Sequence, residues 1–82
     1  MKNHSMTITK LNNELRDMGF TNVEIEIKMF MGLPWLYILV GRGSDSIKLD
    51  LSVATLEKYG AVKLAYAIYK EWHKQTIKKI FK

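Results

Sequence analysis

Apolar residues follow two different periods along this chain, and each change of period marks a boundary between elements. The first apolar residues recur at spacings of three and four, which is the period of a helix with one buried face. They are Ile8, Leu11, Leu15 and Met18. Gly19 and then Phe20 follow, as is typical of a left-handed helix end with an apolar residue behind it. The pattern predicts a helix from about Thr7 to Met18.

The next part of the chain alternates apolar with polar residues, which is the period of half-buried strands. One alternating run consists of Val23, Ile25, Ile27 and Met29, and a later one of Ile47, Leu49 and Leu51. The segment 35–40 between them is apolar at every position, which predicts a central strand with a neighbour on each side. Residues 32–34 and 41–46 are predicted to be turns, because they are rich in glycine, proline and small polar residues.

The rest of the chain is predicted to be helical. Ser52 is a plausible N-terminal cap. Gly60 is either a glycine tolerated within one helix or a break between a short helix, 53–59, and a long one, 61–80. We favour the break.

Together these elements predict an α+β fold in one small domain, residues 1–82. An N-terminal helix is followed by a three-stranded antiparallel meander and a C-terminal helix or helix pair on one sheet face. Residues 1–6 are expected to be loose. The expected core joins Leu11, Leu15, Ala65, Ile68 and Trp72 to the alternating residues Val23, Ile25, Ile27, Ile47, Leu49 and Leu51. Either Trp35, Tyr37 and Leu39 or Leu36, Ile38 and Val40 must point away from it.

This order of elements is similar to that of double-stranded RNA-binding domains and of small toxins built on the same scaffold. Those domains carry a paired-lysine cluster where the closing helix begins, whereas this chain has Val53–Lys58 there. The toxins present a histidine on the sheet, and no predicted strand of this chain contains one. The likeness therefore implies a fold and no activity.

Excess positive charge is concentrated in the basic helical segment 53–82. From Lys58 to the end there are seven lysines and one acidic residue, a net of +6, while residues 1–57 have a net charge of −1. Five of these lysines fall on one side of the helix, opposite an apolar stripe made by Ala65, Ile68, Tyr69 and Trp72. We call them the lysine face: Lys63, Lys70, Lys74, Lys78 and Lys82.

A continuous row of lysines predicts binding to nucleic acid or to an acidic protein surface. Little sequence specificity is expected, because the only arginines, Arg16 and Arg42, lie elsewhere, and arginine is the usual reader of guanine. A solvated helix face is an equally good explanation of the pattern.

Two apolar sets predict protein contacts instead. Phe30, Trp35 and Tyr37 form an aromatic set on the sheet, and such residues are common interface anchors. They favour an inhibitor or accessory module, of the kind found in phages and mobile elements, that blocks an acidic or nucleic-acid-binding surface. Ile77 and Phe81 lie among the lysines, which suggests a structural homodimer or a frayed end.

Other functions are disfavoured. The chain has no cysteine, so thiol chemistry and disulfides are excluded. We expect no catalytic site, metal or cofactor. His4 lies in the segment expected to be loose, and His73 has no acidic residue three or four positions away, so no nucleophile, base and orienting group form a set. The longest apolar run, residues 29–40, is too short to span a membrane, and the start of the chain lacks a secretion signal. We therefore expect a cytoplasmic protein that does not enter membranes.

Overall fold

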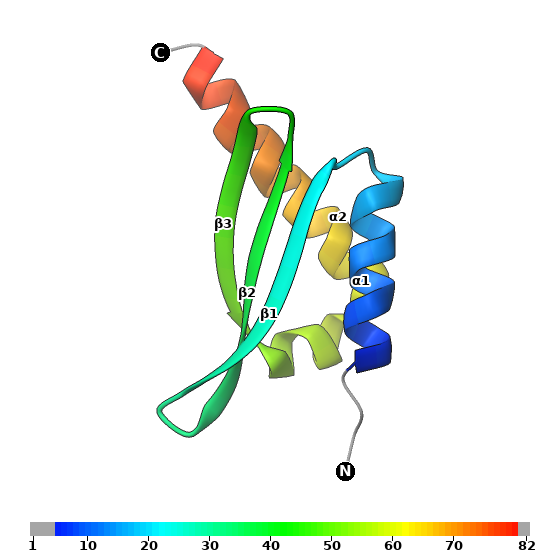
Figure 1. The fold of residues 1–82 in the computed structure, drawn as a ribbon, viewed down its shortest axis with the longest axis vertical. Coiled ribbons are helices and arrows are strands. Elements are labelled where there is room, and N and C mark those ends of the chain that lie inside the picture. Colours follow the sequence, from blue (N-terminus) through cyan, green and yellow to red (C-terminus); the bar gives the residue numbers. More distant parts are fainter. Residues whose placement is uncertain (1–4, 81–82) are drawn as a thin grey trace.

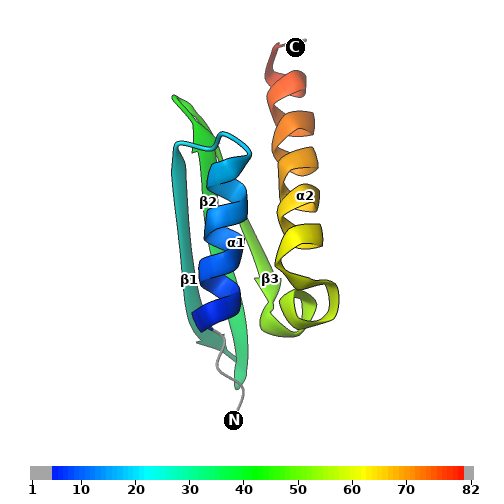
Figure 2. The ribbon, with the colours of Figure 1, turned by 90° about the vertical axis from the view of Figure 1, so that its right-hand side faces the viewer.

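The computed structural model describes the backbone of residues 5–80 and the side chains of residues 7–77. The elements follow in the order α1 (Ser5–Asp17), β1 (Asn22–Phe30), β2 (Leu33–Arg42), β3 (Asp45–Ser52) and α2 (Val53–Ile80) (Figure 1). The three strands form an antiparallel meander in the order β1-β2-β3. Both helices lie on the same face of the sheet (Figure 2). The predicted α+β architecture is confirmed.

The strand register decides which side of the central strand faces the helices. Val40, Ile38 and Leu36 pair with Val23, Ile25 and Ile27 on one side and with Ile47, Leu49 and Leu51 on the other. Those three β2 residues are therefore the buried ones, and together with α1 and α2 they form the core. Trp35, Tyr37 and Leu39 occupy the outer face, which neither helix covers.

One expected core residue lies outside the core. Ile27 is 42% exposed, because β1 and β2 extend as a hairpin past the start of α1 (Figure 1). The chain reverses at Met31 and Gly32, both with positive φ, so Leu33 and Pro34, expected in the turn, already belong to β2. Positive φ at both central residues is the signature of a type I′ hairpin turn.

The first helix ends with the predicted cap and begins earlier than predicted. Gly19 has a φ of 97°, the amide of Phe20 donates to the carbonyl of Leu15, and that of Gly19 donates to Arg16, as in a Schellman motif. The helix already includes Ser5 and Met6, which were expected to be loose. No helix among residues 5–80 has the combination of length and apolar character that crossing a membrane requires.

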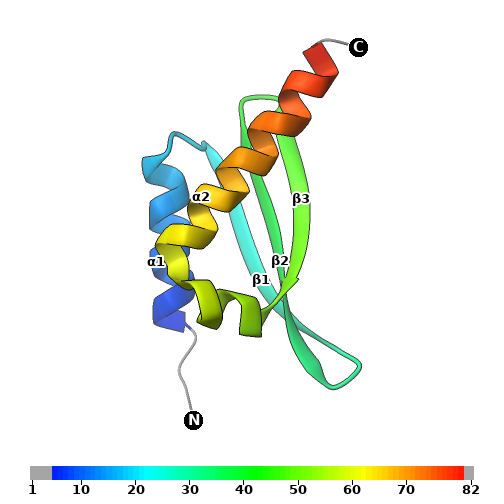
Figure 3. The ribbon, with the colours of Figure 1, turned by 180° about the vertical axis from the view of Figure 1, so that it is seen from behind.

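The second helix is bent at Gly60. Its φ of 80° and ψ of 165° are non-helical, so a short helix precedes the break and a long one follows it, as favoured from the sequence. Ser52 caps the start of the short helix, since the Thr55 amide donates to its hydroxyl at 3.2 Å. The bend lets the long helix cross the sheet diagonally (Figure 3).

Candidate nucleic-acid interface

An aromatic cluster fixes the rotation of α2 about its own axis. The ring of Trp72 contacts Phe20 edge-on, with centroids 5.2 Å apart, and its indole N–H donates to the carbonyl of Asp45 at 3.1 Å. Tyr69 packs against the same phenylalanine, at 6.0 Å. Because Phe20 precedes β1 and Asp45 opens β3, α2 is held against both edges of the sheet at this level.

Arg42 completes the cluster at the end of β2. Its guanidinium carbon lies 5.1 Å from the centroid of the Trp72 ring, and the Phe20 and Tyr69 rings are also within cation–π distance. Its Nε donates to the carbonyl of Gly19 at 3.2 Å, and its Nη2 donates to the carbonyl of Met18. This cation is therefore used to close the C-terminal end of α1, where positive charge offsets the helix dipole.

With α2 anchored in this way, the described lysines of the lysine face point away from the core. Ala65, Ile68 and Trp72 are buried, and Lys63, Lys70 and Lys74 are exposed on the opposite side. At 1.5 Å per residue, the stretch from Lys63 to Lys74 is about 17 Å long. The distance between neighbouring phosphates of one DNA strand is about 3.4 Å along the axis, so this stretch matches roughly five of them.

Within the described part of the chain, these three lysines have no carboxylate partner. No carboxylate among residues 7–77 forms an ion pair with them, and the ion pair in that range joins Lys28 to Glu26 on the sheet at 3.6 Å. Glu71, the acidic residue among the lysines, instead accepts a hydrogen bond from Gln75 at 3.1 Å. The ammonium groups are thus available to an external anion.

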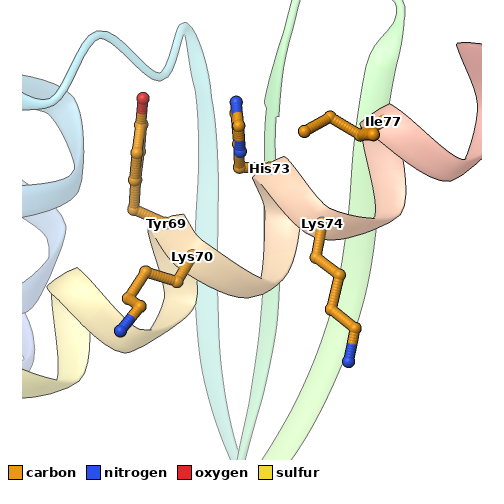
Figure 4. A pocket seen from close by; sticks show the side chains of 5 residues that line it. All are labelled: Tyr69, Lys70, His73, Lys74 and Ile77. Carbon is orange, nitrogen blue, oxygen red and sulfur yellow. The ribbon is translucent and has the colours of Figure 1, made fainter.

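Next to these lysines the surface is hollowed, over a volume of about 400 Å³ (Figure 4). Its walls are Tyr69, Lys70, His73, Lys74 and Ile77. The rings of Tyr69 and His73 stack, with centroids 6.2 Å apart and an angle of 12° between their planes. Figure 4 shows both rings projecting to one side of α2 and both lysines to the other. The two rings and the two lysines therefore border the hollow from different sides of the helix.

Sequence reasoning missed one member of this surface. Tyr66 is 57% exposed, and the ammonium of Lys70 lies 5.3 Å from its ring centroid. The spacing of four residues between them was the available signal, because residues at i and i+4 share a helix face. Exposed aromatic rings between lysines are typical of surfaces that bind nucleic acid by stacking as well as by charge.

Three predicted site residues lie wholly or partly outside the described part of the chain. Lys78 belongs to α2, but its side chain is not among those described, and Phe81 and Lys82 follow the last described residue. Ile77 is described and is 37% exposed among the lysines, as its helical position predicted.

The aromatic set on the sheet is divided by the structure. Phe30 and Tyr37 are exposed on the outer face, whereas Trp35 is half-buried there and its indole N–H has no hydrogen-bond partner. Beyond them lies the hairpin tip, residues 29–33, where Met31 is 87% and Leu33 61% exposed. This apolar tip is at the opposite end of the molecule from the C-terminal turns of α2 (Figure 1).

Within residues 7–77, histidine and carboxylate side chains do not gather in a group of three that could hold a metal ion. Comparison of the chain with protein-family models, curated proteins and solved structures found no match. Fold and surface define a small α-β-β-β-α domain in which the described lysines of the lysine face, Lys63, Lys70 and Lys74, are exposed.

Proposed function

We propose that this protein binds nucleic acid through the lysine face of α2, mainly by contacts to the phosphate backbone. The observation that carries the proposal is the exposure of Lys63, Lys70 and Lys74 on one side of an anchored helix, without a carboxylate partner among the described residues. Charge alone attracts polyanions, and a row of fixed spacing places the charges along a strand.

A neighbouring ring gives this surface a second means of binding. Tyr66 is exposed beside Lys70, so an unpaired base has a ring to stack on while its phosphates contact the lysines. No arginine lies on the lysine face, so guanine edges are not read by the usual bidentate contact. Affinity should therefore depend strongly on salt and weakly on sequence.

Fluorescence anisotropy with labelled duplex and single-stranded oligonucleotides over a range of salt concentrations tests the proposal. If each of the five lysines of the lysine face contacts one phosphate, the slope of log affinity against log salt is near −4.5 for a duplex. Each lost contact reduces the magnitude of the slope by about 0.9. Replacing Lys63, Lys70 and Lys74 with glutamine should therefore reduce it by about 2.7.

A matched control removes the same charge elsewhere. Lys10, Lys28 and Lys58 are exposed on α1, on the outer face of the sheet and on the short helix before Gly60. Their replacement with glutamine should leave the slope nearly unchanged. Equal loss in both triple variants would show that net charge, and no particular face, drives binding. Absence of binding at low salt would refute the proposal.

A second candidate function is protein binding through the hairpin tip and the outer sheet face. Met31 favours it, because a bulky side chain with φ of 51° is strained and this one is also almost fully exposed. Nothing in the fold requires methionine there. A partner that covers Met31, Leu33 and Phe30 would give these residues a role.

A further inference from the structure

The free edge of β3 has only some of the features that protect an unpaired strand. β3 pairs with β2 on one side, and its other edge has no strand partner in the described part of the chain. Natural sheets protect such edges with proline, a bulge, a charge that points into the core, or charged side chains elsewhere on the edge strand. From Ser46 to Ser52 there is no proline, the register with β2 is uninterrupted, and both charges lie on the outer face.

The arrangement of these charges makes the edge complementary to itself in one register. A two-fold axis perpendicular to the sheet keeps inner residues opposite inner residues. It must therefore lie midway between one residue and the same residue of the second copy. The two registers with the longest overlap are centred on Lys48 and on Leu49. The first places Lys48 against Lys48 of the second copy, and like charges directly opposite are unfavourable.

The register centred on Leu49 has no such conflict. It places Lys48 against Asp50 of the second copy, and by symmetry Asp50 against Lys48, on the outer face. On the inner face Leu49 meets Leu49 and Ile47 meets Leu51. Leu49 and Leu51 are half-buried edge residues that a second strand would cover.

The other edge of the sheet matches itself less well. For β1 the longest register is centred on Glu26 and opposes two copies of that carboxylate. The register centred on Ile27 pairs Glu26 with Lys28 of the second copy, but it also places Glu24 against the aromatic ring of Phe30.

We infer that a second copy of this chain pairs with the edge of β3, antiparallel and centred on Leu49. Two three-stranded sheets thereby become one continuous sheet of six strands. A two-fold axis perpendicular to the sheet keeps both helical layers on one side, so the two lysine faces belong to the same side of the dimer. The inference is independent of nucleic-acid binding, since it rests on β3 alone.

Disulfide trapping tests the register directly, because the chain contains no cysteine. Residues directly opposite each other in an antiparallel pair have Cα atoms about 4.5–5.5 Å apart, which is within reach of a disulfide. Leu49→Cys should therefore give a covalent dimer under mild oxidation. Ile25→Cys is the matched control, because Ile25 is half-buried on the same rung of the opposite edge strand. Equal cross-linking of both variants, or of neither, would overturn the inference.

A charge swap tests the same pairing without cysteine. Sedimentation at increasing concentration measures the dissociation constant of the dimer. Lys48→Asp or Asp50→Lys alone should raise this constant roughly tenfold, since each replaces two attractive cross-strand pairs by two repulsive ones. The double variant Lys48→Asp/Asp50→Lys should restore it. Both side chains are exposed in the monomer, and circular dichroism verifies the fold. A wild-type chain that remains monomeric at all concentrations, or a double variant that is no better than the single ones, would refute the pairing.

Discussion

Arg42 shows how one side chain can connect elements that are distant in the sequence. It closes α1 through the carbonyls of Met18 and Gly19, and it lies among the rings of Phe20, Tyr69 and Trp72. Gly19 makes this possible, because any other residue at this position would place its Cβ 2.9 Å from Nη2 of Arg42, which is too close for a non-bonded contact. The residue is thus part of the structure that orients α2, although its charge alone would suggest a surface role.

Arg42→Ala should lower the free energy of unfolding by about 2 kcal/mol, through loss of charged hydrogen bonds and cation–π contacts. Arg42→Lys should recover only part of this, because a lysine lacks the planar fork that reaches both carbonyls. Urea unfolding followed by tryptophan fluorescence measures both. Arg16→Ala is the control: Arg16 is exposed and bonds Asn12 within α1, so an equal effect there would contradict the assigned role.

At the scale of elements, the bend in α2 determines where the lysine face lies. The short helix leaves the end of β3, and only after Gly60 does the chain cross the helical side of the sheet. The φ and ψ of Gly60 fall in a region that is essentially restricted to glycine. A straight helix from Val53 onward would carry the lysines in another direction.

Gly60→Ala should therefore destabilise the protein by about 1–3 kcal/mol, because alanine is strained in this conformation. Chemical denaturation gives the value. If α2 were continuous, the same change would stabilise it by about 1 kcal/mol, so the sign decides between the two arrangements. Ala67→Gly changes an exposed position within the long helix. It measures how much free energy of unfolding is lost when glycine replaces alanine inside a regular helix.

At the scale of the whole molecule, the hairpin tip is packed differently from the body of the fold, which is formed by both helices and the part of the sheet that they cover. The body contains the continuous core between the sheet and both helices, whereas the side chains at the tip are exposed. An apolar, strained tip adds nothing to the packing of the body. The fold should therefore tolerate its replacement.

The double variant Met31→Asn/Leu33→Ser should unfold at the same free energy as the wild type or about 0.5 kcal/mol higher, because Asn-Gly is the preferred type I′ turn. Thermal and urea unfolding measure this. Leu36→Ala in the buried centre of β2 should by contrast cost about 2–5 kcal/mol. A large loss from the tip variant would show that the tip is part of the core.

Periodicity predicted the element order, the Gly19 cap and the Gly60 break correctly, because each depends on residues close together in the chain. The choice between the two faces of residues 35–40 was not predictable, since both faces are apolar. Ile27 was misassigned for a related reason: its alternation identifies a face, but not how far the helices extend over it. The lysine positions followed from helical spacing, whereas the ring of Tyr66 beside Lys70 was overlooked.

Local patterns therefore established the helices, the strands and the grouping of lysines on one side of a helix, because neighbours in the chain create those periods. The direction in which that side points depends on contacts between distant residues: Arg42 with the end of α1, and Trp72 with Asp45 and Phe20. Such contacts follow from packing in three dimensions, which a pattern along one strand or helix does not encode. Packing also left the edge of β3 and the hairpin tip uncovered.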